Sequence, residues 1–124
     1  MRYLILIHSN PRSRALWETL TDEQRMEFGR GYMQLTEELA ASGELVVSQG
    51  LTDPALAKRV WVQDGETMSS DGPFAEVKEY LAGFYLVDCE SEARALEWAA
   101  KAPDAQLGGP VEVRPILDMS TLDL

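Results

Sequence analysis

The order of hydrophobic and polar positions along the chain predicts where its strands lie. The segments 3–7 and 81–87 are apolar at successive positions, a pattern typical of strands that are covered on both faces. The segment 111–116 alternates between apolar and polar residues and contains Pro115, which favours a strand at the edge of a sheet. We therefore expect central strands at 3–7 and 81–87, an edge strand at 111–116, and a further strand that begins at 45–47 and ends near Gly50.

A long helix is predicted over 22–42, where apolar residues take on helical spacing. They recur at intervals of four, three and four positions and are Phe28, Tyr32, Leu35 and Leu39. Thr21 precedes Gln24 by three residues, as in a capping box, and favours a helix start at this point. Gly43 is suited to end the helix in a left-handed backbone conformation.

A hairpin is predicted at 59–68, because Asp64 and Gly65 form a favoured two-residue turn between two strand-like segments. A second turn is expected at 70–73, where the side chain of Asp71 can bond to the backbone that follows it. The chain should therefore reverse direction twice in this region.

A short helical turn is expected around 15–17, and a second helix is expected to open at Ser91 and to stop at Pro103. The order of the main elements is then strand, helix, strand, hairpin, strand, helix, strand. This order predicts an α+β fold, a ferredoxin-like βαββαβ sandwich with an inserted β-hairpin and both helices on one face of the sheet.

The opposite face of this sheet has no helix to cover it, although the central strands are apolar on both faces. We expect the same face of a second copy to cover it, which gives a two-fold homodimer with the sheets face to face. The alternative is that the hairpin at 59–68 and the C-terminal tail fold over this face.

Composition narrows the class of protein further. The length of 124 residues fits a single domain over 1–124, and a formal net charge of −10 argues against direct binding of nucleic acid. Most of the negative charge lies in 44–124. No apolar run approaches the length of a membrane span, and the single Cys89 cannot form an internal disulfide, so we expect a cytoplasmic protein that is not bound to a membrane.

Few residues carry recognisable chemistry. His8 is the single imidazole, at the end of a central strand, and is the best acid–base candidate; the alternative is a histidine that only bonds to its own loop. The planar guanidinium of Arg59 is suited to a substrate carboxylate, although a surface role is the more common one. Asp71 fits a turn better than a catalytic site.

The sequence gives no sign of a metal or other cofactor. One His and one Cys, 81 positions apart, offer no metal-ligand spacing, and no Gly-rich loop precedes a helix, so we expect neither a metal nor another cofactor.

The segment from Ser70 to Tyr85, which includes Asp71-Gly72-Pro73-Phe74, resembles the signature of the DGPF-domain proteins, a branch of the YciI-related family. The similarity covers essentially the whole chain. It implies a dimeric α+β barrel built from two ferredoxin-like halves. YciI-like members have been thought to be enzymes because of a His–Asp pair, and DGPF members occur beside, or fused to, extracytoplasmic-function sigma factors. The resemblance places Tyr32 at the position of that His and Asp53 at the position of that Asp.

Two hypotheses about function follow. The first is a small-molecule-binding protein or cofactor-free enzyme, such as a lyase or isomerase, whose substrate the sequence does not identify. Its binding residues are Tyr32, Ser48, Arg59, Asp71 and Phe74, with His8 as the catalytic group. The second is a regulatory partner of a sigma factor in transcription initiation, without catalysis, in which the acidic surface contacts a basic protein. Convergence of His8, Arg59 and the turn at Asp71 on one polar cavity would favour the first hypothesis.

Overall fold

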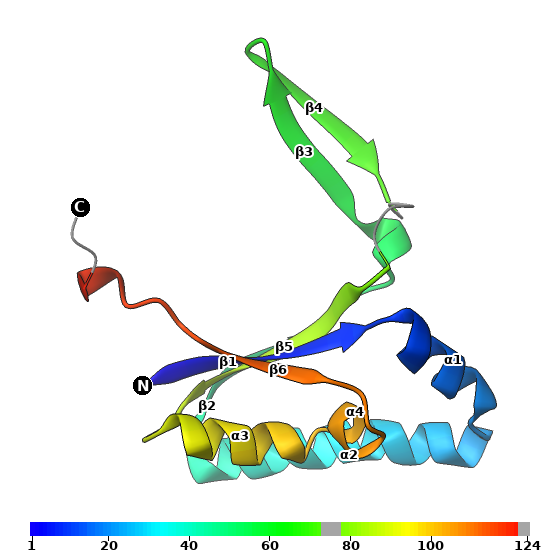
Figure 1. Ribbon diagram of the computed structural model, residues 1–124, viewed down its shortest axis with the longest axis vertical. Coiled ribbons are helices and arrows are strands. Elements are labelled where there is room, and N and C mark those ends of the chain that lie inside the picture. The colour runs from blue at the N-terminus through cyan, green and yellow to red at the C-terminus, as the bar shows by residue number, and fades with distance from the viewer. Residues whose placement is uncertain (73–77, 122–124) are drawn as a thin grey trace.

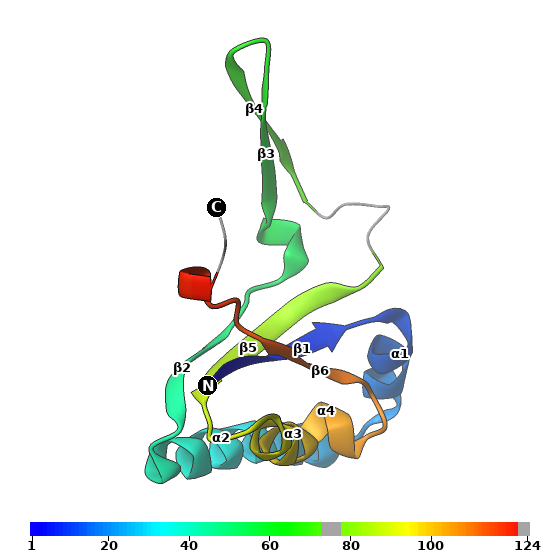
Figure 2. The same ribbon diagram turned by 60° about the vertical axis from the view of Figure 1, so that its left-hand side comes forward.

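The computed structural model describes residues 1–72 and 78–121, which form an antiparallel sheet with helices on one face and a separate hairpin (Figures 1 and 2). The strands of the sheet are β1 (Arg2–Ser9), β2 (Leu45–Gly50), β5 (Tyr80–Asp88) and β6 (Val111–Pro115). The hairpin consists of β3 (Lys58–Gln63) and β4 (Glu66–Asp71). Within the described residues the α-helices are α1 (Pro11–Thr19), α2 (Asp22–Ser42), α3 (Glu92–Ala100) and α4 (Pro103–Gln106). Short 3-10 turns lie at Pro54–Leu56 and Met119–Thr121.

The sheet has the strand order β2-β5-β1-β6, and every neighbouring pair is antiparallel. This is the ferredoxin-like βαββαβ arrangement that the sequence predicts, with the hairpin β3–β4 inserted between the second and third strands of the sheet. The apolar strands β1 and β5 are central and β6 is an edge strand, as expected from Pro115. The helix α2 has the predicted bounds, with Thr21 and Gln24 in a capping box and Gly43 at a φ of 80°.

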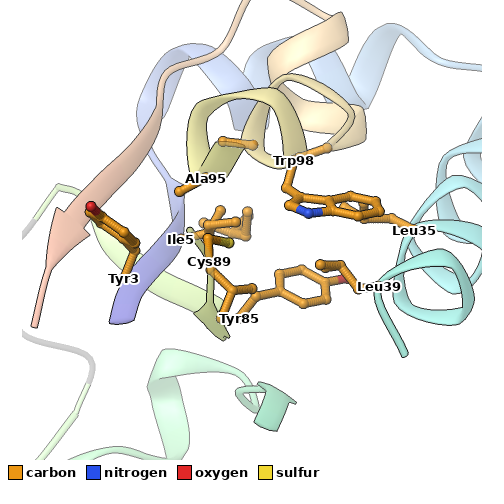
Figure 3. Close-up of a cluster of buried hydrophobic side chains, with 12 residues drawn as sticks. Tyr3, Ile5, Leu35, Leu39, Tyr85, Cys89, Ala95 and Trp98 are labelled. Carbon is orange, nitrogen blue, oxygen red and sulfur yellow. The ribbon is translucent and has the colours of Figure 1, made fainter. Parts of the chain in front are cut away.

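The core lies between the sheet and the helices α2 and α3 (Figure 3). Side chains of β1 alternate, and the odd-numbered ones point to this core, where Tyr3 and Ile5 are buried. They meet Leu35 and Leu39 of α2 and Trp98 of α3. Cys89 is also buried here, and burial raises the pKa of its thiol to about 11, so the thiol is protonated at neutral pH.

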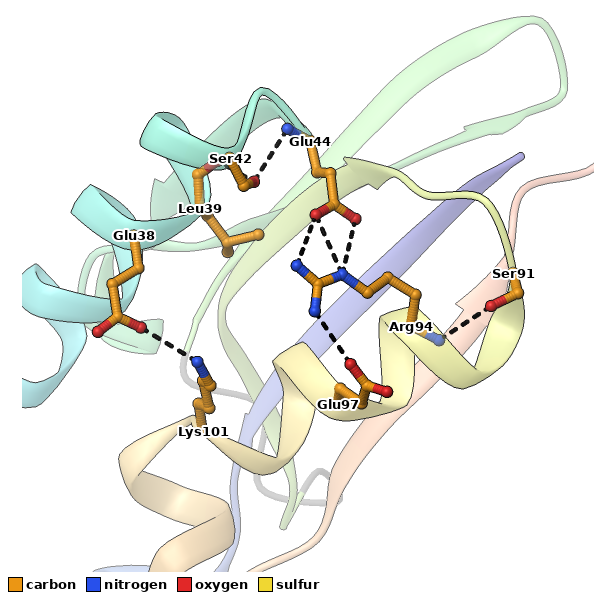
Figure 4. Close-up of polar contacts among 8 residues, drawn as sticks. All are labelled: Glu38, Leu39, Ser42, Glu44, Ser91, Arg94, Glu97 and Lys101. Carbon is orange, nitrogen blue, oxygen red and sulfur yellow. Dashed lines mark hydrogen bonds and ion pairs between the residues drawn. The ribbon is translucent and has the colours of Figure 1, made fainter.

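Ion pairs tie α3 to the C-terminal end of α2 (Figure 4). The Arg94 guanidinium donates to both carboxylate oxygens of Glu44, just after α2, at 2.9 to 3.2 Å, and to Glu97 at 3.0 Å. Lys101 reaches Glu38 of α2 at 3.4 Å. The hydrogen bonds from Arg94 hold the pKa of the Glu44 carboxyl below its ordinary value.

The other face of the sheet carries the even-numbered side chains of β1. Leu4, Leu6, Phe84 and Leu86 lie here and are only partly buried. The hairpin β3–β4 and the C-terminal segment 116–121 project on this side of the sheet (Figures 1 and 2). The hairpin stands away from the sheet, and its Val60 and Val62 are 66% and 69% exposed.

Three local expectations were wrong in their bounds. The turn expected at 15–17 is part of a helix that starts at Pro11, because Asn10 and Ser13 form a capping box. The helix α3 ends at Ala100, before Pro103, and Pro103 instead opens the separate helix α4, since proline is well suited to the first turn of a helix. Asp71 belongs to β4, where it pairs with Lys58, so the hairpin is longer than predicted.

Candidate functional site

The candidate site lies beside the N-terminal half of α2. The buried core packs against the other half of this helix, through Leu35 and Leu39. The helix α2 has 21 residues and α3 has nine, so α3 covers only the C-terminal part of α2 (Figures 1 and 2). At the other end, α1, α4 and the end of β1 surround hollow space. The difference in length between the two helices therefore creates the site.

Two adjoining cavities occupy this space. The Tyr32 cavity has a volume of about 370 Å³ and lies between α2 and the strands β2 and β5, where Tyr32, Thr36, Ser48 and Tyr85 line it. The Arg12 cavity has a volume of about 380 Å³ and lies between α1, the end of β1 and the segment after α4. Residues that line both cavities are Ile7, Phe28, Ala82 and Asp104. Each volume falls within the range of small-molecule sites, which is roughly 300–1,000 Å³.

Tyr32 and Asp104 form the polar centre of this region. The phenol of Tyr32 donates a hydrogen bond to Oδ2 of Asp104. Burial raises the pKa of the Asp104 carboxyl, and the hydrogen bond from Tyr32 opposes that change. Burial raises the pKa of Tyr32 well above its ordinary value, and the hydrogen bond to Asp104 is the second largest cause of this change. The phenol therefore keeps its proton. A carboxyl group beside a phenol can accept a proton and return it.

A glycine of α2 lets α4 carry Asp104 close to Tyr32. A Cβ added at Gly31 would lie 2.8 Å from Cγ of Pro103, which is closer than side chains tolerate. Gly29 lies two residues earlier on α2, and a Cβ added there would meet open space. The absence of a side chain at Gly31 is therefore what allows the close approach of the two helices.

Aromatic rings form one wall that runs along both cavities. Trp17 contacts Phe28 with ring centroids 5.4 Å apart, and Phe28 contacts Tyr32 at 5.3 Å, both in edge-to-face geometry. Trp17 lines the Arg12 cavity, Tyr32 lines the Tyr32 cavity, and Phe28 lines both. The wall gives a ligand an apolar surface that leads to the Tyr32–Asp104 pair.

His8 lies at the rim of the Arg12 cavity and has two carboxylate neighbours. Its Nε2 is 3.2 Å from Oε1 of Glu112, and its Nδ1 is 3.5 Å from Oε1 of Glu79. A change of register between Ile7 and His8 shifts the pairing with β5 at this point. Glu112 belongs to β6 and Glu79 directly precedes β5, the two strands that flank β1, so the ring lies between these two carboxylates.

The structure brings some of the predicted site residues together and separates others. Tyr32 and Ser48 line the Tyr32 cavity, and His8 lines the adjoining Arg12 cavity. Arg59 and Asp71 lie on the hairpin β3–β4, which is not hydrogen-bonded to the four-stranded sheet. Phe74 lies outside the described residues.

The sequence did not indicate Asp104 as a partner of Tyr32. The family resemblance suggested Asp53, but the Asp53 side chain accepts a hydrogen bond from the Ala55 backbone and caps a 3-10 turn. Proline followed by an acidic residue is a common helix opening, so Pro103-Asp104 was a signal for α4. Nothing local could link that helix to a phenol 72 positions earlier.

The described residues contain neither a candidate metal site nor a candidate membrane-spanning helix. No group of three or more His, Cys, Asp and Glu side chains there could hold a metal ion. Among the same residues, no helix is both long enough and apolar enough to cross a membrane. The expected absence of a metal or other cofactor stays a prediction.

Comparison with known proteins places this geometry in a family. An uncharacterised protein of Rhizobium meliloti (strain 1021) is 34% identical over 117 residues, which cover 94% of this chain and 92% of the relative. A solved structure with similar fold is the 5-chloro-2-hydroxyhydroquinone dehydrochlorinase TftG of Burkholderia phenoliruptrix AC1100, in complex with 2,5-dihydroxybenzoquinone. It has a TM-score of 0.54 and 15% identity, and the match covers 99% of this chain and all of that one. Residues 1–120 match the YCII-related domain, and the chain therefore belongs to the YCII-related domain family.

Proposed function

We propose that this protein binds a small organic molecule in the two adjoining cavities and acts on it as a cofactor-free acid–base enzyme. The observation that carries the proposal is the hydrogen bond from Tyr32 to Asp104 at the junction of the two cavities. Burial of a carboxylate costs stability, and a half-buried carboxylate that faces a cavity is therefore a candidate for proton transfer.

Asp104 is the proposed base and Tyr32 the residue that positions it. Asp104 accepts a proton from a carbon of the ligand, and the electron pair of the broken C–H bond moves into a new C=C bond. In a lyase, the leaving group on the neighbouring carbon departs with its own bonding pair, and Asp104 passes its proton to that group or to solvent. In an isomerase, the double bond shifts and the proton returns from Asp104 to another carbon. Both reactions balance without a metal, oxidant or reductant.

Comparison with the dehydrochlorinase supports binding of a small ring compound by this fold, because that protein was solved with 2,5-dihydroxybenzoquinone. Ser48 and Tyr32 are proposed contacts of the ligand in the Tyr32 cavity. His8 is proposed as a second proton-transfer group at the rim of the Arg12 cavity. Arg59, Asp71 and Phe74 stay predicted binding residues, as does membership of the DGPF branch.

A homodimer is also proposed, with the partly buried side chains of the uncovered sheet face as the interface. Leu6 and Phe84 lie on this face. A stable interface buries roughly 1,200 Å² or more in total. Light scattering over a dilution series tests this: twice the chain mass of 13.8 kDa is expected, and that mass alone at micromolar concentration would overturn it. The sigma-factor alternative stays a prediction that nothing in the described residues strengthens.

Ligand capture tests the proposed function. The purified wild-type protein is incubated with a small-molecule extract of cells, and bound compounds are released and identified by mass spectrometry. We expect one compound to be enriched and then converted on longer incubation. Asp104→Asn should keep the compound and lose conversion. Asp64→Asn, the same chemical change in the hairpin turn, should behave as the wild type.

Two outcomes would contradict the proposal. If neither wild type nor variant captures any compound, the cavities are not a binding site. If Asp104→Asn converts the compound at the wild-type rate, the Tyr32–Asp104 pair is not the acid–base centre.

A further inference from the structure

The Arg12 cavity contains positive charge for which the described residues supply no carboxylate partner. The protein has 21 acidic and 11 basic residues, so a basic side chain readily finds an acidic neighbour. Elsewhere Lys58 lies near Asp71 and Lys101 near Glu38. The excess of acidic residues makes any cation without such a neighbour informative.

Arg12 and Arg14 line the cavity, and neither has a carboxylate within 4 Å among the described residues. Arg14 donates to the backbone carbonyl of Lys78 at 2.8 Å and to the hydroxyl of Ser9 at 3.2 Å, and it stacks on Tyr80. These neutral partners fix the guanidinium of Arg14 in place and leave its charge unbalanced. Arg12 has no hydrogen bond or ion pair with a described residue.

The acidic side chains that line the same cavity are already engaged. Glu18 lies 3.8 Å from Arg25, and Asp104 accepts the hydrogen bond of Tyr32. The cavity therefore presents a cationic end beside α1 and an aromatic wall of Trp17 and Phe28 that leads to Asp104. A ligand that matches both features has an apolar body and one anionic end.

We infer that the ligand is a small organic acid, with its carboxylate at Arg12 and Arg14 and its apolar or ring body along Phe28 toward Tyr32. This inference rests on the proposed function, because it names the class of molecule that the same site takes. A guanidinium binds a carboxylate through two parallel hydrogen bonds, which fixes the orientation of the body as well as its charge. The reacting carbon then lies toward Asp104.

The test uses benzoate and benzamide as probes, which have the same ring and shape and differ in charge. Binding is measured by calorimetry and by the chemical shifts of amides around the two cavities. For wild type we expect benzoate to bind about tenfold or more tightly than benzamide. Arg12→Gln should weaken benzoate binding by about tenfold and leave benzamide unchanged. Arg2→Gln, which removes the same charge at the far end of β1, should bind both as wild type does.

The outcomes separate this inference from the proposed function. Equal binding of both probes, with no effect of Arg12→Gln, overturns the organic-acid inference and leaves a small-molecule site in place. Binding of neither probe at millimolar concentration overturns the inference, whereas the proposed function is then judged by ligand capture alone. Competition by inorganic phosphate as strong as that by benzoate would also overturn it, because the cationic end would then bind any anion without help from the aromatic wall.

Discussion

The two ends of α2 differ in what packs against them. At the C-terminal end, Leu39 is fully buried against the sheet and Trp98, and Glu44 joins the helix to Arg94 of α3. At the N-terminal end, Phe28 and Tyr32 of the same apolar stripe face two cavities. One periodic stripe of side chains therefore contributes to both the buried core and the cavities. The boundary between the core and the cavities lies where α3 stops covering α2.

The two ends also differ in how polar groups are used. At the C-terminal end of α2, which we call the filled end, oppositely charged side chains form ion pairs that connect α2 and α3. At the N-terminal end, which we call the open end, the partly buried carboxyl group of Asp104 lies beside the phenol of Tyr32. Arg12 and Arg14 line the cavity there. The ion pairs at the filled end stabilise the packing of two helices, whereas the charged groups at the open end line a cavity. Truncation of an apolar side chain should therefore cost more stability at the filled end than at the open end, and removal of a carboxylate charge should have opposite signs at the two ends.

The largest expected effect is at the filled end. Leu39→Ala should lower the free energy of unfolding by about 2–5 kcal/mol, because it removes a fully buried side chain and leaves a void. Phe28→Ala should lower it by less than about 2 kcal/mol, since the ring already faces hollow space. Urea denaturation of both variants measures the difference. Equal losses would show that the two ends are packed alike.

A smaller effect is expected from two glycines of α2. Gly29→Ala should raise the free energy of unfolding by about 0.5–1 kcal/mol, because alanine favours a helix interior and its Cβ meets open space. Gly31→Ala gains the same propensity but presses on Pro103, so it should lose most of that gain and displace Asp104 from Tyr32. Thermal melting measures the first effect, and amide shifts around Asp104 measure the second. Similar melting temperatures and unshifted amides in both variants would contradict the close approach of α4.

Asp104→Asn should raise stability at neutral pH by up to about 1 kcal/mol. The folded state raises the pKa of Asp104, so the stability that this group contributes is present at low pH and is lost as pH rises through the folded-state pKa. The neutral amide avoids that loss. Unfolding midpoints of the two proteins should therefore differ at pH 7 and converge near pH 3. A less stable variant at pH 7 would mean that the carboxylate is stabilising.

The smallest effect is expected from Glu44, since both it and Arg94 reach solvent and solvent screens their attraction. The folded state lowers the pKa of Glu44, so its contribution is present above its ordinary value of 4.5 and is lost as pH falls through the lower folded-state pKa. Glu44→Gln should be less stable than wild type at pH 7 and should match it at low pH. This trend is opposite in sign to that of Asp104→Asn. The same trend in both variants would break the comparison between the two ends.

Local sequence patterns determined most of the elements and their order. Thr21, Gln24 and Gly43 define the ends of α2 because capping depends on neighbours within a few residues. Pro115 indicated an edge strand because proline lacks the hydrogen needed for a second ladder. Tyr32 and Ser48 were predicted as site residues, and the fold places both in one cavity. The pattern also indicated that one sheet face has no helix of its own.

The tertiary structure alone decided where the candidate site lies and which groups meet in it. Asp104 reaches Tyr32 only because Gly31 admits α4 and because α3 ends before it covers the whole of α2. Arg59 and Asp71 were grouped with them from residue type, but the hairpin carries both away from the sheet. Helix caps and strand alternation follow from contacts within a few residues, whereas the site depends on contacts between segments far apart in the chain. A single sequence does not encode those contacts in any local pattern, and they are fixed only when the elements pack.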